Sequence, residues 1–362
     1  MYNAKIIADS ISPFSKRLTT FIVTYPRIVH AEMCRHRMHS RNTASSRAIP
    51  FSKMVKEVEE NPFIPIAWQK SHKGMQGSEY FDDYVPLIIH WEIARDKAIE
   101  TAKTLNKQGV TKQLCNRLLE PFVWVTEIIT GTEWANFFEL RCPQYVVNWY
   151  SSQKNKTEIF RSRKEVINHV EENNLKNGWE NCRNWDDNQW LQINNSQAEI
   201  HIQKIAEMMW DARNESTPKQ LKAGEWHIPF GDNFDDGKLR DMFWIADKNP
   251  DPSYVAWQKE KVKIATARCA RLSYATLGDN PKIDYEADIR LHDKLASMKH
   301  WSPFEHCARA MTEYEFNSHH RGIFVPYGDD NKDEVGMALD SNSFGWCGNL
   351  QGWINYRNLI EP

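Results

Sequence analysis

The densest group of chemically active side chains lies between residues 35 and 47, in the sequence RHRMHSRNTASSR. A guanidinium group binds a phosphate through two parallel hydrogen bonds, and hydroxyl and amide groups can fill the remaining acceptor positions. The plainer alternative is a solvated basic helix end, because cations are favourable at a helix C-terminus. The mixture of planar cations with small hydroxyl groups favours an anion-binding site.

This segment resembles the Arg-His-Arg-x-x-Ser-x-Asn-Glu-x-Ser-x-Arg-Tyr signature of the flavin-dependent thymidylate synthases. Two positions depart from it, because Thr43 stands where the family has glutamate and Ala48 where it has tyrosine. The positions that match are Arg35, His36, Arg37, Ser40, Asn42, Ser45 and Arg47.

Other segments are similar to the same family. Residues 299–306 (KHWSPFEH) resemble its His-x-Thr-Pro-Phe-Glu-His stretch, 270–274 (ARLSY) its Ala-Arg-Val-Ser segment, and 195–200 (NSQAEI) its His-Ala-Gln-x-Glu-Ile segment. In the family the first two precede the Arg-His-Arg segment, whereas here they follow it. We therefore predict a circular permutation, which a fold tolerates when its original termini lie close together.

The resemblance divides the chain into four parts. It covers residues 18–141, 195–213 and 262–316. We therefore expect a core of residues 1–141, 195–213 and 262–316, with 142–194 as an insertion, 214–261 as a connecting segment and 317–362 as a C-terminal extension.

The resemblance implies one-carbon transfer from methylenetetrahydrofolate to C5 of dUMP, giving dTMP, with reduced FAD as hydride donor and NADPH as reductant of the flavin. The residues implied to bind FAD are Arg35, His36, Arg37, Asn42, Asn136, Ser273, His300, Ser302 and Glu305. Those implied to bind the nucleotide are Glu32, Ser45, Ser46, Arg47, Arg117 and Arg141, with Arg141 and Ser45 as the catalytic pair. The family assembles as a homotetramer, so self-association is expected, and no metal is implied.

Three alternatives remain open. Glu32 replaces a family glutamine, Thr43 a glutamate and Asn195 a histidine, so the acceptor could be dCMP or the product a hydroxymethyl group. A thiolate mechanism could use Cys142, which follows Arg141. A non-catalytic nucleotide or nucleic-acid binder could use the basic and aromatic side chains of residues 149–164.

Composition limits the remaining classes. The 362 residues carry 46 Lys and Arg against 48 Asp and Glu, a net charge of −2, which argues against bulk nucleic acid or an anionic membrane as the main partner. The sequence contains no apolar run long enough to span a membrane and no signal peptide is apparent, and its seven cysteines form no C-x-x-C unit. These features predict a reduced, cytoplasmic protein without a structural zinc site.

The periodicity predicts an α+β fold with a twisted antiparallel or mixed sheet and long helices. Strands are expected over 18–29 and 308–316, and helices over 87–105, 196–209 and 287–298. Residues 143–195 show little periodicity and are expected to carry one short helix, and 317–352 are expected to form a structured loop.

Overall fold

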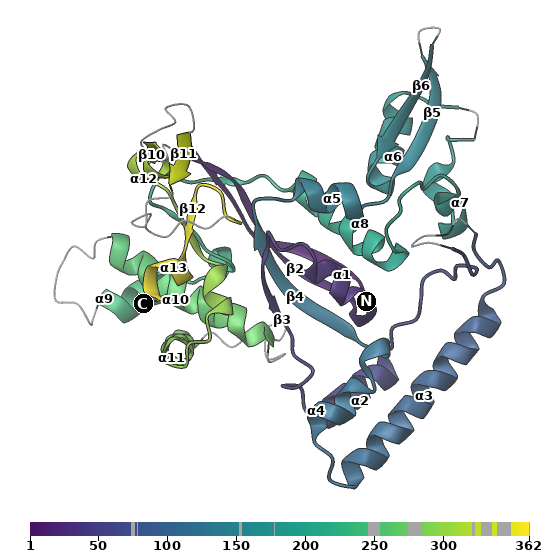
Figure 1. Ribbon diagram of the computed structural model, residues 1–362, viewed down its shortest axis with the longest axis horizontal. Helices are drawn as coiled ribbons and strands as arrows, with labels where there is room; N and C mark the ends of the chain where they lie inside the picture. The colour runs from purple at the N-terminus through teal and green to yellow at the C-terminus, as the bar shows by residue number, and fades with distance from the viewer. Residues whose placement is uncertain are drawn as a thin grey trace.

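A five-stranded mixed sheet forms the centre of the molecule in this computed structural model (Figure 1). The structure describes residues 1–73, 77, 79–151, 154–176, 178–244, 254–273, 284–320, 323–326, 335–338 and 349–361. The strand order is β3-β4-β2-β1-β7, with β1 (Asn3–Ser12), β2 (Ser15–Pro26), β3 (Ser40–Thr43), β4 (Trp124–Gly131) and β7 (Lys219–Gln220). All neighbours pair antiparallel except β1 and β7, which confirms the α+β class and the mixed sheet.

Alternation along β2 gives the sheet two buried faces. Phe21, Val23 and Tyr25 enter the largest core cluster, whereas Ile22 packs with the cluster on the opposite face. A sheet that is covered on both sides needs apolar residues at successive positions, which explains why this strand is visible in the sequence.

Three helices cover the first face: α1 (His30–Cys34), α5 (Ala135–Arg141) and α8 (Ile200–Glu215), the first preceded by η1 (Arg27–Val29). Trp134, Phe137 and Phe138 fill the space between α5 and the sheet and are almost fully buried. The start predicted for α8 at Ser196 is wrong, because the Glu199 side chain accepts the first free backbone N–H groups of this helix.

The second face is covered by segments from the C-terminal third of the chain (Figure 1). They include α10 (Tyr254–Ser273), α11 (Tyr285–Ser297), η5 (Ser302–Glu305) and α13 (Tyr356–Ile360). A small sheet of order β12-β9-β8 joins them, built from β12 (Trp353–Asn355), β9 (Ala308–Ala310) and β8 (Trp226–His227). The strand predicted over 308–316 is therefore short, since α12 (Glu313–His320) begins three residues after it.

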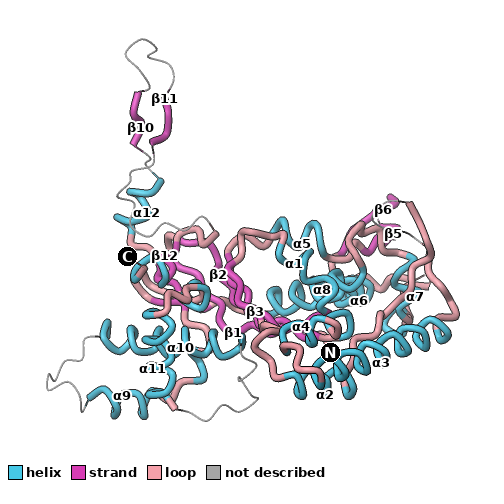
Figure 2. Tube along the Cα trace, turned by 60° about the horizontal axis from the view of Figure 1, so that its bottom comes forward, coloured by secondary structure: helices cyan, strands magenta, loops and turns pink. Residues whose placement is uncertain are grey.

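A helical layer lies beyond the end of the sheet. It contains α2 (Phe51–Glu60), α3 (Val85–Lys107), α4 (Lys112–Arg117) and η2 (Glu120–Phe122), and Figure 2 shows α3 along its outer edge. The long helix predicted over 87–105 is confirmed.

The insertion is more ordered than predicted. It forms a hairpin of β5 (Tyr145–Ser151) and β6 (Lys154–Phe160), followed by α6 (Arg163–Glu172), η3 (Cys182–Asn184) and α7 (Asp187–Gln192). These elements enclose a hydrophobic cluster of their own, including Val147, Val166 and Trp190. The prediction of one short helix is wrong because strands, loops and the short helix α7 contribute much of this cluster, and such segments leave no helical period.

The remaining elements are η4 (Gly231–Asn233), α9 (Asp236–Trp244), β10 (Ile323–Pro326) and β11 (Val335–Ala338), of which the last two pair antiparallel. Most of the loop predicted over 317–352 lies outside the described residues. Within the described part, no helix is long and apolar enough to cross a membrane.

Candidate functional site

The Arg-His-Arg segment lies where α1 ends and the chain turns into β3. His36 is buried in this turn, and Arg141 at the end of α5 donates from Nε to His36 Nε2 over 3.0 Å. The structure therefore brings together two predicted site residues that are 105 positions apart. Because Arg141 uses its Nε–H for this bond, both terminal nitrogens of its guanidinium group remain available for a ligand.

The charge states of this pair follow from their surroundings. Burial lowers the pKa of His36 to about 4, and the guanidinium groups of Arg141 and Arg41 act in the same direction. The imidazole is therefore neutral near pH 7, as an acceptor for Arg141 must be. Burial also lowers the pKa of Arg141, with Arg35 adding to this effect and the Glu32 carboxylate opposing it.

Glu32 contributes a carboxylate that is incompletely satisfied. Its Oε2 atom is buried and has no hydrogen-bond partner among the described residues. A buried acceptor without a donor is costly, so such an atom is a candidate for contact with a ligand that donates. Arg35 and Arg37, on either side of His36, are exposed.

A second group of predicted residues follows β3 at its other end. The Asn116 amide donates to the Ser46 carbonyl over 2.7 Å, which places Arg47 and Arg117, the neighbours of these two residues, in the same region. Both arginines are exposed. The Ser46 hydroxyl donates to Glu120, at 3.0 Å, so in this state it is engaged by the protein.

A third group lies on the opposite face of the sheet. Asn42 donates to the Cys269 carbonyl of α10 over 2.6 Å and its Oδ1 accepts from Ser302 at 3.3 Å. Glu305 is engaged by Arg357 at 2.6 Å. His300 and Asn136 are exposed, and the Ser273 side chain lies outside the described residues.

The predicted residues therefore form three groups within one chain. Alternation along β3 directs Asn42 toward α10, whereas Arg41 and Thr43 face the side that carries Arg141. No single cluster in the described part contains the whole predicted FAD set.

The arginines show which of these groups lack protein partners. Most described arginines form an ion pair with Asp or Glu, namely Arg17, Arg27, Arg41, Arg95, Arg161, Arg163, Arg183, Arg268, Arg271, Arg290, Arg309 and Arg357. Among the arginine side chains that the structure describes, those without such a pair are Arg35, Arg37, Arg47, Arg117, Arg141 and Arg213. All but the last are residues that the sequence assigned to anion binding.

The sequence missed a buried carboxylate beside this site. Glu127 on β4 is fully buried and accepts from Tyr25 at 2.7 Å, from Arg41 at 3.0 Å and from Thr43 at 2.8 Å. Thr43 pairs directly with Glu127 across the two strands, so a carboxylate lies beside position 43. In the sequence, Glu127 is visible only as a single acidic residue within the apolar run of β4.

A second buried network crosses the sheet from β1 to the end of η5. His227 binds Ser10 at 3.0 Å and Thr20 at 2.8 Å, Thr20 binds Thr130 at 2.8 Å, and Thr130 binds His306 at 2.8 Å. Burial lowers the pKa of both histidines to about 3. They are neutral near pH 7 and connect the C-terminal segments to the sheet.

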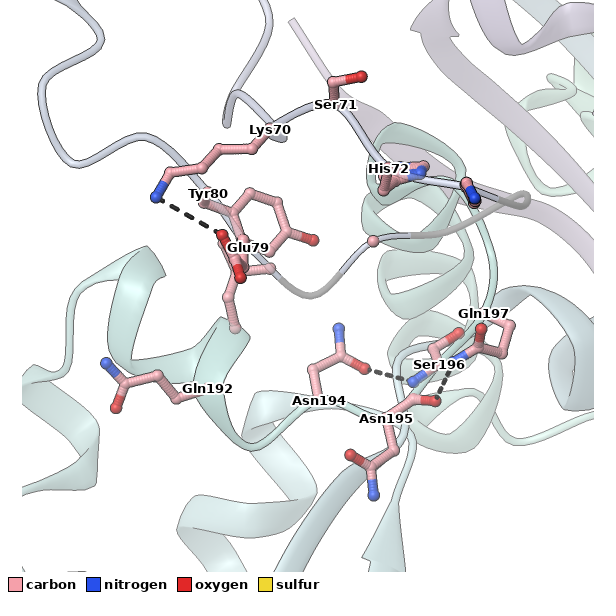
Figure 3. A pocket seen from close by; sticks show the side chains of 13 residues that line it. Lys70, Ser71, His72, Glu79, Tyr80, Gln192, Asn194, Asn195, Ser196 and Gln197 are labelled. Carbon is pink, nitrogen blue, oxygen red and sulfur yellow. Dashed lines mark hydrogen bonds and ion pairs between the residues drawn. The ribbon is translucent and has the colours of Figure 1, made fainter.

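The segment that resembles His-Ala-Gln-x-Glu-Ile lines a cavity of about 610 Å³ (Figure 3). Asn195, Ser196 and Gln197 lie on one side of it, opposite Lys70, which pairs with Glu79 at 3.7 Å. None of the predicted arginines lines this cavity, so it is separate from the groups described above.

Two of the alternatives lose support from the structure. Cys142 is fully buried and burial raises the pKa of its thiol, which disfavours the thiolate mechanism at this residue. In the insertion, Arg161, Arg163 and Lys164 are paired with Glu139, Asp187 and Glu215, which leaves fewer free cations for a nucleic acid.

No family model matches this chain, and no curated protein matches it. Solved structures that are similar include the UMP/dUMP methylase PolB from Streptomyces cacaoi bound with 5-Br dUMP, at 16% identity and a TM-score of 0.33, covering 39% of this chain and 79% of that one. The same enzyme bound with 5-Br UMP gives 16% identity and a TM-score of 0.31, covering 42% of this chain and 82% of that one.

Proposed function

We propose that this protein is a flavin-dependent enzyme that transfers a one-carbon unit from methylenetetrahydrofolate to C5 of a pyrimidine deoxynucleotide, with dUMP as the acceptor. The observation that carries the proposal is the set of unpaired arginines. Arg35, Arg37, Arg47, Arg117 and Arg141 lack carboxylate partners among the described residues, and the resemblance to the flavin-dependent thymidylate synthases assigns all five to FAD or nucleotide binding.

Arginines that are free of protein carboxylates are available to bind phosphate groups through their planar forks. Two such groups lie at the two ends of β3, one around His36 and one around the contact between Ser46 and Asn116. The proposed ligands are a dinucleotide and a phosphomonoester, so two anion-binding groups suit them.

The residues present fit FAD and a nucleotide in different ways. Arg35 and Arg37 would hold FAD through its phosphates, and reduced flavin would supply the hydride chemistry when bound. Arg141 would contact the pyrimidine, where a cation stabilises negative charge that develops on the ring oxygens. His36 would act as a positioning residue, since its Nε2 fixes the orientation of the guanidinium group.

A second candidate acceptor is dCMP, and Glu32 favours it. Its buried Oε2 atom can only accept a hydrogen bond when the carboxylate is ionised. Cytosine offers an N4 amino group to such an acceptor, which is the pairing that carboxylates use to recognise this base. Uracil offers only its N3–H, so the choice of base depends on which ring edge faces Glu32.

The proposed circular permutation is supported by a contact at the expected break. In the proposed ancestral order Phe316 would lead toward β2, and its ring lies 5.9 Å from that of Phe14, just before β2 begins.

The test combines flavin binding with turnover. We expect purified protein to bind FAD, seen as quenching of flavin fluorescence, and to release tritium from C5-labelled dUMP or dCMP when methylenetetrahydrofolate and NADPH are present. Arg141→Gln should lower kcat/KM by about 100-fold or more. Protein that neither binds FAD nor labilises the C5 proton of either nucleotide would refute the proposal.

Arg183→Gln is the control, because it makes the same substitution at an exposed arginine that pairs with Glu171 in the insertion. It should leave kcat/KM within roughly twofold, as expected for a solvated surface pair. An equal loss in both variants would show that the effect of Arg141→Gln is not specific to the site.

A further inference from the structure

Two reactive side chains outside the predicted site residues lie at the beginning and end of α1. His30 and Cys34 are one helical turn apart, and the Cys34 sulfur lies 3.6 Å from His30 Nε2. One ring nitrogen of His30, the Cys34 sulfur and a Glu127 oxygen all lie within 4.8 Å of one another. Cys34 is also exposed, whereas the other cysteines that the structure describes are buried.

The hydrogen bonds around His30 determine which of its nitrogens carries the proton. Tyr25 has one hydroxyl hydrogen and donates it to Glu127 at 2.7 Å. The contact of 2.8 Å between the same hydroxyl and His30 Nδ1 must therefore be a bond that Nδ1–H donates. The neutral imidazole then has its lone pair on Nε2, directed toward the Cys34 sulfur.

This arrangement has the features of a metal-binding histidine. Such histidines usually donate their second nitrogen to a carboxylate or another acceptor, which fixes the tautomer and orients the ring. Here the Tyr25 hydroxyl accepts the hydrogen bond from His30 Nδ1–H, and the buried Glu127 carboxylate in turn holds the hydroxyl in place. Both Glu127 oxygens already accept hydrogen bonds, from Tyr25 and Arg41 on one side and from Thr43 on the other, so Glu127 is expected to support the site from behind the imidazole.

The spacing of the two ligand atoms also suits a tetrahedral ion. With Zn–N near about 2.0 Å and Zn–S near about 2.3 Å, tetrahedral geometry holds the nitrogen and sulfur about 3.5 Å apart. The observed 3.6 Å needs almost no rearrangement. A nitrogen and a thiolate together select borderline-soft cations such as Zn²⁺ over Mg²⁺ or Ca²⁺.

The charges nearby are compatible with a divalent cation. Arg41 is neutralised by Glu127 at 3.0 Å, and Arg27 lies 3.9 Å from Glu120. Binding would displace the thiol proton to solvent, so that Cys34 becomes a thiolate ligand. The negative charge of the thiolate then neutralises one of the two positive charges of the ion.

We propose that His30 and Cys34 form a binding site for a single divalent cation of the Zn²⁺ type, with Tyr25 and Glu127 as positioning residues and water completing the coordination. The site does not depend on the proposed enzymatic function. It uses the face of α1 that points toward Glu127.

Co²⁺ is the probe, because a thiolate bound to it gives a charge-transfer absorption that free thiols lack. We expect one equivalent of Co²⁺ to bind the full-length reduced protein with this band, and Zn²⁺ to displace it. Cys34→Ser should abolish the band, and His30→Gln should weaken Co²⁺ binding at least tenfold. Tyr25→Phe should keep the band but weaken binding about 10- to 100-fold, because the tautomer is no longer fixed.

Cys347→Ser is the control, since Cys347 lies outside the described residues and must be shown not to supply the thiolate. This variant should retain the band and the affinity. Saturation with Co²⁺ that gives no thiolate band, no uptake of the ion at all, or a band that persists in Cys34→Ser would each overturn the proposal.

Discussion

The buried network of His227 and His306 predicts a loss of stability at mildly acidic pH. Both imidazoles are fully buried, and burial lowers the pKa of each to about 3. In the unfolded chain a histidine has a pKa of about 6.5. The unfolded state therefore binds more protons between these values, so the free energy of unfolding falls as the pH drops below about 6.5 and levels off near 3.

The magnitude follows from this difference. Between pH 7 and pH 5, an unfolded histidine gains a proton while the buried one does not, which costs about 2 kcal/mol per residue. The pair should therefore remove about 4 kcal/mol. Asp211 acts in the opposite direction, because burial raises its pKa to about 6 and protonation then favours the folded state. A comparison between variants removes this contribution, since it is common to both.

The assay is urea unfolding at pH 7 and pH 5 for the wild type and for His306→Gln. Glutamine can still bond Thr130, which His306 contacts at 2.8 Å, but it does not titrate. We expect the variant to be less stable at pH 7 and to lose about 2 kcal/mol less than the wild type on acidification. Equal losses in the two proteins would refute the reasoning, because they would mean that His306 is not the group being protonated.

Three further predictions concern other buried groups. Glu127→Gln should lower the free energy of unfolding by about 3–5 kcal/mol, because Arg41 then remains as a largely buried charge without its counter-ion. A loss below about 1 kcal/mol in urea unfolding would contradict this. Cys142→Ala should leave turnover within roughly twofold in the tritium-release assay, since its thiol is fully buried and protonated, whereas inactive but folded protein would restore the thiolate mechanism. Trp353→Ala should cost about 3–5 kcal/mol in the same unfolding assay, because this fully buried side chain also bonds the Lys16 carbonyl, and a change near zero would show that the C-terminal segment is dispensable.

Periodic segments were predictable from the sequence because their packing is regular. Phe21 and Val23 alternate on a strand, and α3 shows a helical repeat along much of its length. The insertion was not predictable, since residues such as Trp190 and Leu175 reach its core from a short helix and a loop. A small cluster assembled from such segments has no period that a sequence can reveal.

The site could be predicted only in part for a similar reason. The types and spacing of Arg35, Arg37 and Arg47 indicate anion binding, because that chemistry requires several guanidinium groups close in the chain. Glu127 and Tyr25 reach the same region through strand pairing over about a hundred positions, and only the register of β2, β4 and β3 brings them together. Their role depends on tertiary structure, so the local sequence carries little trace of it.

The two faces of β3 explain why one chain leaves the predicted FAD residues in separate groups. Arg41 and Thr43, which are not in the predicted FAD set, face Glu127 on the side that carries Arg141, and His36 contacts Arg141. The FAD residue Asn42 instead faces α10 and Ser302. A four-residue strand with alternating side chains cannot direct all of its polar groups to one ligand. If the protein binds FAD as proposed, residues of a second copy must complete each site, which is possible in a symmetric oligomer. Mixing inactive Arg141→Gln with inactive Asn42→Ala should then restore part of the turnover, whereas a site within one chain would remain inactive in the mixture.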